Sequence, residues 1–396
     1  MNACDQWLSQ FYGKLPREDY SLLERAARTL LGNILIPAEG KRLPWAPWRG
    51  ITPSHVGFRG VWNWDSAFHA VGVSRWDAAL AREQILMFLE RQQPSGLLPD
   101  VVFEDGRIAD NFGKPPVMPW AALTIDRRAP DDAFLQEVYP KFVLYESHWR
   151  QNRGGDRHGL FNYDAVDADP AKRLTDAKYE SGWDNSVRWD GGIYEVWPVD
   201  LNCFMVMLYQ ALAQMAGRLR LPQDAGRWEK AGAELAQRIE TRLWDAATGA
   251  YRDFDFGKGA FVDALSPASF MPLYVRIADK PHAEAMARLA ASPKKFTPGW
   301  PSVAYDDRRF DPTGYWRGRT WLNVAYFALK GLKDYGFDEV ADAGRDTLLA
   351  WVRNTPGHIH ENYHPLTGAP LGAADFSWSA VFTIEFLLNW TPGRSL

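Results

Sequence analysis

Residues 180–189 bring three kinds of reactive side chain into one short segment. Two carboxylates, two indoles and three further hydrogen-bonding groups lie there: Glu180, Asp184, Trp183, Trp189, Asn185, Ser186 and Arg188. A pyranose ring offers an apolar face to an indole and a rim of hydroxyl groups to carboxylate, amide and guanidinium groups. The segment therefore favours a sugar-binding site. The alternative interpretation is an exposed loop whose tryptophans pack inward.

Three further segments combine aromatic, acidic and amide side chains in the same way. They are residues 61–69, residues 313–323, and residues 358–368 with 376–379. Asp65 and Ser66, in the first of them, are also suited to capping a helix. That interpretation leaves Trp62 and Trp64 without a role.

Glycoside hydrolysis needs two carboxyl groups with different tasks. One is protonated and assists the leaving oxygen, while the other is ionised and activates water or attacks the sugar. We expect Asp184 and Glu361 to form this pair, although spacing alone does not select them over Asp65 or Glu180.

The bulk composition excludes several classes of protein. The 396 residues are 46% hydrophobic and carry a net charge of −4, so no electrostatic surface for nucleic acid or an anionic membrane is expected. The N-terminus lacks a signal-peptide pattern, and no apolar run reaches the roughly 20 residues that span a bilayer. We expect a soluble cytoplasmic protein in which Cys4 and Cys203 are free thiols. The 19 tryptophans suggest an aromatic-lined binding surface, and the sequence does not indicate an oligomeric state.

Helical periodicity dominates the chain. It predicts about twelve helices, at residues 21–36, 64–73, 77–92, 117–127, 131–152, 198–218, 222–244, 267–278, 281–291, 315–336, 337–353 and 376–390. Ser21 or Asp19 is the expected N-cap of the first. Antiparallel pairs without a linker predict a single all-α domain over residues 1–396, an (α/α)6 barrel with its long loops converging at one end. A helical solenoid is the competing architecture, and the lack of sequence repeats counts against it.

The aromatic and acidic segments resemble the signatures of glycoside hydrolase family 63. They are residues 62–66, 180–186, 314–318, 361–368 and 376–379, which follow the family's order and cover most of the chain. The family includes processing α-glucosidases and bacterial mannosylglycerate and glucosylglycerate hydrolases, and it is related in fold to trehalases. The compact chain, without an added β-sandwich, is closer to the bacterial glycerate-glycoside hydrolases.

The resemblance implies an (α/α)6 barrel and an inverting mechanism with Asp184 as general acid and Glu361 as general base. It also implies that Trp62 or Trp64, with Asp65, holds the sugar whose bond is cut. The full set of candidate substrate-binding residues is Trp62, Trp64, Asp65, Lys114, Trp183, Arg188, Trp189, Tyr315, Trp316, Arg317, Tyr363 and Trp378.

Lys114 departs from this pattern. It precedes a Pro-Pro pair at a position where the small-substrate enzymes are expected to carry Gln. A lysine only donates hydrogen bonds and adds positive charge. It would favour an anionic group such as glycerate, would mark a different substrate, or is simply exposed to solvent.

Local environment gives the same assignment of acid and base. Trp183 and Trp189 would form a low-dielectric wall that keeps Asp184 protonated, whereas the polar neighbours of Glu361 would keep it ionised. Arg317 is alternatively a partner for a buried carboxylate, and Glu180 is alternatively part of a helix-end ion pair.

Two other functions remain open. One is a sugar 2-epimerase that uses His69, His358 and His360 in the same barrel, and the other is a non-catalytic carbohydrate-binding protein. No metal or other cofactor is expected, because the cluster of His358, His360 and His364 has no matching third ligand motif. The expected partner is a small carbohydrate or glycoside, either an α-glucoside or an α-mannoside.

Overall fold

The computed structural model describes residues 2–37, 39 and 41–392. Its helices fall into two groups that differ in how apolar side chains are distributed around them. Helix α9 (Val199–Arg218) is apolar around most of its circumference and is buried along almost its whole length. Helix α10 (Pro222–Arg242) buries only one face, which carries Trp228, Leu235 and Ile239. A helix that is apolar all round belongs in the interior, and one with a single apolar stripe covers it from outside.

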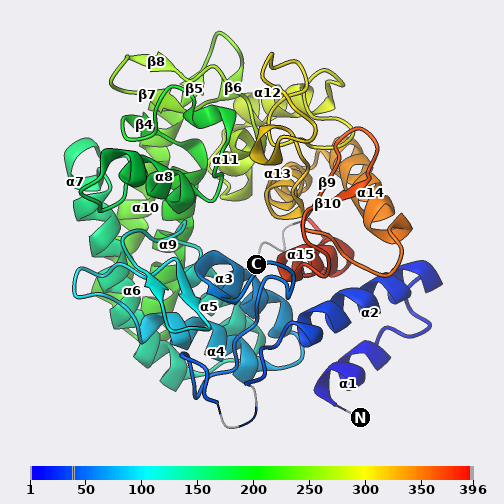
Figure 1. Cartoon of the computed structure of the whole chain (residues 1–396). Coiled ribbons are helices and arrows are strands. Elements are labelled where there is room, and N and C mark those ends of the chain that lie inside the picture. Colours follow the sequence, from blue (N-terminus) through cyan, green and yellow to red (C-terminus); the bar gives the residue numbers. More distant parts are fainter. Residues whose placement is uncertain (1, 38, 40, 393–396) are drawn as a thin grey trace.

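The two groups form a double ring (Figure 1). In the described part of the chain, six inner helices contact one another in a closed circle: α3 (Asn63–Val73), α5 (Met118–Arg128), α9, α11 (Met271–Tyr274), α13 (Leu322–Asp334) and α15 (Ser377–Leu388). Outer helices cover them: α2 (Arg17–Gly32), α4 (Ala78–Leu89), α6 (Asp132–Asn152), α10, α12 (Lys280–Ala291) and α14 (Asp338–Asn354). Outer and inner helices alternate along the chain, which confirms the predicted (α/α)6 barrel.

The remaining elements are short and lie mostly between the ring helices. They are helices α1 (Ala3–Ser9), α7 (Gly155–His158) and α8 (Pro170–Ser181), with 3-10 turns η1 (Val187–Trp189), η2 (Pro267–Phe270) and η3 (Tyr315–Arg317). The strands are β1 (Gly60–Trp62), β2 (Val101–Phe103), β3 (Ile108–Ala109), β4 (Val196–Trp197), β5 (Trp244–Asp245), β6 (Ala250–Tyr251), β7 (Phe254–Asp255), β8 (Ala260–Phe261), β9 (Asn362–Tyr363) and β10 (Pro370–Leu371). They pair antiparallel in the orders β1-β2-β3, β4-β7-β8, β5-β6 and β10-β9.

Most predicted helices are confirmed to within a few residues, and three predictions need correction. Helix α2 begins at Arg17 after Pro16, so neither Ser21 nor Asp19 is its N-cap. Residues 267–278 form a 3-10 turn and a short helix instead of one helix. Helix α13 begins at Leu322 and not at residue 315, because residues 315–317 form a separate 3-10 turn. Helix α8 was not predicted.

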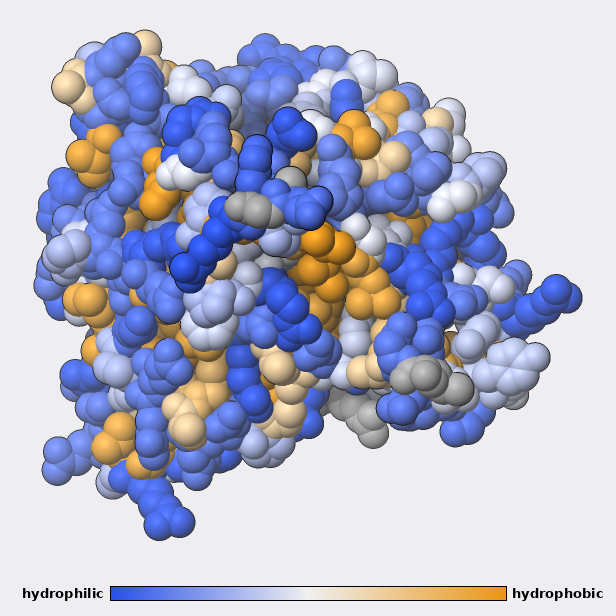
Figure 2. All heavy atoms as spheres, turned by 60° about the horizontal axis from the view of Figure 1, so that its bottom comes forward, coloured by the Kyte–Doolittle hydropathy of each residue, from blue (hydrophilic) through white to orange (hydrophobic). Residues whose placement is uncertain are grey.

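The surface agrees with this burial pattern. The face in Figure 2 is mostly hydrophilic, with hydrophobic residues scattered over it and a larger hydrophobic area near its centre. Cys4 and Cys203 are buried and free, as predicted. Among the described helices, none combines the length and the apolar character that crossing a bilayer requires.

Candidate active site

The N-terminal ends of the inner helices position the candidate residues. Because every inner helix follows an outer one, these helices run in the same direction, and the segments that precede them meet at one end of the ring. Trp62 precedes α3, Lys114 precedes α5, and residues 183–189 precede α9. Residues 315–321 precede α13, and residues 361–376 precede α15. Segments far apart in the sequence therefore share one face of the barrel.

A close approach between backbone and indole joins the first two segments. Gly182 ends α8 in the left-handed conformation, with φ of 72°. A Cβ atom added there would lie 2.4 Å from Cη2 of Trp64, so only glycine fits against this ring. The last turn of α8, and Asp184 beyond it, is thereby placed against the start of α3.

The side-chain amide of Asn185 joins the second segment to the third. Its Oδ1 accepts a hydrogen bond from the backbone N–H of Trp316 at 3.0 Å, and its Nδ2 donates to the carbonyl of Gly314 at 3.1 Å. The loop that carries Asp184 is thus fixed to the turn that carries Tyr315.

A chain of indole rings runs beneath all four segments. Trp183 lies against Trp316 at a centroid distance of 4.8 Å, and Trp316 stacks on Trp321 at 3.9 Å with an angle of 2°. Trp321 contacts Trp378 at 5.8 Å, and Trp378 contacts Trp64 at 5.4 Å. All five rings are buried, so they form a rigid base for the polar groups.

Glu361 sits on this base and receives two hydrogen bonds. The hydroxyl of Tyr315 donates to its Oε1 at 2.9 Å, and the backbone N–H of Ala373 donates to its Oε2 at 3.1 Å. Burial raises the pKa of Glu361, and both donors and the nearby charge of Arg319 oppose that rise. A buried carboxylate that accepts two hydrogen bonds is suited to staying ionised.

Asp184 and Asp65 are also influenced mainly by burial, and Lys114 is the cation that acts on both. Burial is the main cause that raises the pKa of Asp184, and burial raises the pKa of Asp65 to about 8. The charge of Lys114 opposes both shifts. The charge of Asp184 also acts on Glu361, which places the predicted acid and base in one electrostatic environment.

Asp65 does not cap helix α3. The N-cap position belongs to Trp62, which makes no side-chain capping bond, and Asp65 lies inside the first turn with 3% of its surface exposed. The capping interpretation of this residue was therefore wrong.

The structure adds one acidic residue that sequence reasoning missed. Asp100, just before β2, is buried, and its Oδ1 lies 3.3 Å from Nζ of Lys114. Lys114 is itself buried, so the interpretation as an exposed lysine was wrong. No aromatic residue adjoins Asp100 in the sequence, so the pattern used for the other segments does not find it. Its ion pair with Lys114 is the observation that adds it to the candidate site.

Several other predicted residues have structural partners. Every guanidinium nitrogen of Arg188 is bonded to the buried carboxylates of Asp200 or Asp253. Arg317 is paired with the partly exposed Asp190 at 2.8 Å. Glu180 is fully buried in an ion pair with Arg153, as its alternative interpretation predicted.

The last three predicted residues lie around the indole base. Trp189 is buried against Tyr163, at a centroid distance of 6.0 Å. Trp62 is half-buried between Phe58 and Phe103. The hydroxyl of the buried Tyr363 accepts a hydrogen bond from the backbone N–H of His360 at 3.2 Å.

Two of the three candidate histidines, His69 and His358, are bonded to residues outside the carboxylate cluster. His69 is fully buried, and its Nε2 lies 2.5 Å from Oγ of Ser377. Burial lowers the pKa of His69 to about 3. His358 is exposed and lies 2.9 Å from Asp375. Neither placement favours acid–base chemistry by histidine on a bound sugar.

Only one group of described residues has metal-ligand geometry, and it lies elsewhere. Glu240, Asp279 and His282 offer ligand atoms within 4.8 Å of one another. Glu240 already accepts from the hydroxyl of Tyr251 and lies 2.8 Å from Nδ1 of His282, whose ring stacks on Trp244. These contacts already engage Glu240 and His282.

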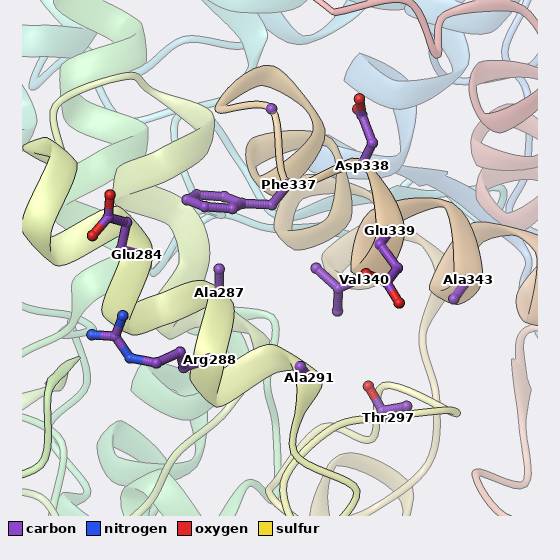
Figure 3. Close-up of a pocket in the computed structure, with 11 residues that line it drawn as sticks. Glu284, Ala287, Arg288, Ala291, Thr297, Phe337, Asp338, Glu339, Val340 and Ala343 are labelled. Carbon is purple, nitrogen blue, oxygen red and sulfur yellow. The ribbon is translucent and has the colours of Figure 1, made fainter.

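A groove of about 690 Å³ between α12 and α14 is also separate from the carboxylate cluster. Figure 3 shows Phe337 and Val340 facing Ala287 across it, with charged side chains such as Glu284 and Arg288 along its edge. It contains none of the predicted site residues.

An (α/α)6 barrel with buried carboxyl groups and indoles at one end is compatible with a glycoside hydrolase, and comparison with known proteins identifies that class. Residues 59–379 match the model of the mannosylglycerate hydrolase MGH1-like glycoside hydrolase domain. The chain belongs to this family, within glycoside hydrolase family 63, and it is a glycoside hydrolase. The (α/α)6 fold and the glycoside hydrolase class implied by the sequence resemblance are therefore confirmed.

Individual relatives are similar over most of their length. A mannosylglycerate hydrolase of Rubrobacter radiotolerans is 26% identical over 83% of this chain and 90% of its own. The GH63 mannosylglycerate hydrolase of Thermus thermophilus, solved in complex with glucose, is 25% identical and covers 92% of this chain and 99% of its own, with a TM-score of 0.78. The neutral trehalase Nth1 of Saccharomyces cerevisiae, at 16% identity, covers 93% of this chain and 80% of its own with a TM-score of 0.71, and it shares the fold.

Proposed function

We propose that this protein is an inverting hydrolase of a short α-glucoside or α-mannoside, with Asp184 as general acid and Glu361 as general base. The observation that carries the proposal is the difference between the two carboxyl environments. Burial raises the pKa of both carboxyl groups, but Glu361 in addition accepts two hydrogen bonds, from Tyr315 and from the backbone N–H of Ala373, that favour its ionised form.

The proposed reaction uses each form directly. Protonated Asp184 gives its proton to the glycosidic oxygen as the bond to the anomeric carbon breaks. Ionised Glu361 takes a proton from a water molecule that attacks the opposite face of that carbon. The product has the opposite anomeric configuration, and both carboxyl groups return to their starting forms by proton exchange with solvent.

The relatives narrow the range of substrates. The similar proteins of Rubrobacter and Thermus are named as mannosylglycerate hydrolases, and the Thermus structures include complexes with glucose and with D-glycerate. A small glycoside of glucose or mannose, with glycerate or another compact aglycone, is therefore the substrate class that we propose for this chain.

Replacement of the two carboxyl groups tests the assignment. Asp184→Asn and Glu361→Gln should each lower kcat on an α-glycoside with an unactivated leaving group by about 10²- to 10⁴-fold, because each removes one of the two proposed catalytic carboxyl groups. Matched controls are Asp263→Asn, at a carboxylate with 96% of its side chain exposed, and Glu339→Gln, on helix α14. Both controls should retain activity.

A substrate that needs no proton donor separates the two roles. An α-glycosyl fluoride has a good leaving group, so Asp184→Asn should keep much of its activity on the fluoride, while Glu361→Gln should not. NMR of the first product should show the β-anomer. Initial release of the α-anomer would exclude inversion. Loss of fluoride hydrolysis in Asp184→Asn with retention in Asp65→Asn would not fit the acid assignment.

A further inference from the structure

A buried ammonium group lies next to the proposed acid. Lys114 has 6% of its surface exposed, and its Nζ donates to the carbonyl of Tyr179 in the last turn of α8. The same Nζ lies 3.3 Å from Oδ1 of Asp100 and 5.9 Å from the ring centroid of Phe112. The ammonium is thus held by a carboxylate, a carbonyl and an aromatic face.

The surrounding backbone fixes both members of this ion pair. The hydroxyl of Tyr145, on α6, donates to the carbonyl of Lys114 at 3.1 Å. The backbone N–H of Asp100 donates to Ala109 of β3, and its carbonyl accepts from the N–H of Asn63, the first residue of α3, both at 2.8 Å. The pair is therefore bonded to α3 and α8, which lead to Asp65 and Asp184, and is held from outside by α6 and β3.

One positive charge here faces three carboxyl groups. Asp100 contacts Lys114 directly, and the charge of Lys114 opposes the rise that burial causes in the pKa of Asp100, Asp65 and Asp184. Asp100 adds a further negative charge that acts on Asp65. Tyr315 and Glu361 complete the charged and titratable surroundings of these carboxyl groups.

We propose that Lys114 is a positioning residue for the glycosidase reaction. It joins the last turn of α8, which leads to Asp184, to Asp100, which is bonded to the start of α3, the helix that carries Asp65, and its charge acts on both carboxyl groups. The inference rests on the proposed function, because it takes Asp184 as the acid. It assigns the ammonium to the protein's own carboxyl groups and not to an anionic aglycone.

Two nearly isosteric variants test the proposal through the pH profile of kcat/KM. Lys114→Gln removes the charge that favours ionised Asp184 and Asp65. The pKa of both carboxyl groups should then rise, and the alkaline limb should move up by about one pH unit or more. Asp100→Asn removes a neighbouring negative charge, so the alkaline limb should move down. The acid limb, set by Glu361, should stay in place in both variants.

A matched control and a second readout keep the result interpretable. Lys280→Gln removes an equivalent charge at an exposed site remote from the carboxyl cluster and should leave the profile unchanged. A carboxyl ¹³C NMR titration of Asp184 in the wild type and in Asp100→Asn measures the same pKa without turnover. The NMR titration tests the proposal even when loss of the buried lysine prevents Lys114→Gln from folding.

Different outcomes would overturn the role proposed for Lys114 and the proposed function of the protein. An active Lys114→Gln with an unmoved alkaline limb would overturn the inference. So would a KM increase limited to glycosides with an anionic aglycone, because that places Lys114 on the substrate. Wild-type protein that hydrolyses none of the glycosides would contradict the proposed function instead, and the NMR titration would still test the effect of the charge.

Discussion

The hydroxyl of Tyr315 illustrates how single side chains prepare this site. Tyr315 adopts the left-handed conformation, with φ of 61°, which a non-glycine residue rarely occupies. In this conformation its hydroxyl reaches Oε1 of Glu361 at 2.9 Å. Backbone strain of about 1 kcal/mol is typical at such positions and is found where a function requires the geometry.

Removing that hydroxyl should change the acid limb of the pH profile. The bond that Tyr315 donates favours ionised Glu361, so Tyr315→Phe should raise the pKa of Glu361. Because the base must be ionised, activity should be lost at a higher pH as the solution is acidified. We expect an upward shift of up to about one unit, measured on kcat/KM.

The exposed Tyr12 provides the control for this change. Tyr12→Phe, at a residue with 75% of its surface exposed, should leave the acid limb unchanged. An unmoved limb in Tyr315→Phe would show that the hydrogen bond does not control ionisation of Glu361.

For single residues, the sequence indicates which side chains are candidates for catalysis, but not which other side chains they contact. Residue type and context were sufficient to propose Asp184 and Glu361. They could not reveal that Arg188 is enclosed by Asp200 and Asp253, because Asp253 lies 65 positions away in the sequence. Asp100 was missed for the same reason, since its importance depends on a contact that only folding creates.

Among the elements, the 3-10 turn η1 joins the acid loop to the barrel. Arg188, in this turn, is bonded to Asp200 on the inner helix α9 and to Asp253 beside β7. Its guanidinium also lies over the rings of Trp183 and Trp189, at 4.8 and 4.5 Å. One buried cation therefore holds a loop, a helix and two indoles together.

Replacing Arg188 by an uncharged residue should destabilise the fold. Arg188→Met leaves two buried carboxylates without their partner and should lower the free energy of unfolding by about 3–5 kcal/mol. Arg317→Met breaks a pair with the partly exposed Asp190 and should cost about 1 kcal/mol or less. Calorimetry or denaturant titration of both variants measures the difference. Equal losses would contradict a structural role for Arg188.

The sequence predicts where the helices lie but not where each of them begins. Apolar periodicity located the ring helices, yet it extended α13 back to residue 315. The true boundary depends on distant backbone pairing, because Thr320 exchanges hydrogen bonds with Tyr363 at 2.9 and 3.0 Å. A pairing between segments so far apart leaves no periodic signal in either of them.

For the whole molecule, the important feature is the seam where the ring closes. Helix α2, near the start of the chain, packs against α15, near its end (Figure 1). Arg25 strengthens the seam by donating to the carbonyls of Thr355 and Val352 at 2.7 and 2.5 Å. Closure is what brings residues 361–378 beside residues 61–66.

A cavity at the seam should weaken the ring without altering the site. Leu23→Ala, at a fully buried position of α2, should lower the free energy of unfolding by about 2–5 kcal/mol. The exposed Ile36, replaced by alanine, should change it by less than about 0.5 kcal/mol. KM should stay constant in both variants. A large change in KM for Leu23→Ala would show that the seam controls the geometry of the site.

The stacked indoles of Trp316 and Trp321 have a further, optical consequence. Two indole rings 3.9 Å apart and nearly parallel couple their electronic transitions, and such coupling produces a circular dichroism signal in the near ultraviolet. The pair lies beneath Tyr315, whose ring is 4.9 Å from Trp321. The difference between the spectra of the wild type and Trp316→Phe isolates this pair from the other tryptophans among the 19 of the chain, so the candidate active site can be followed without any added dye.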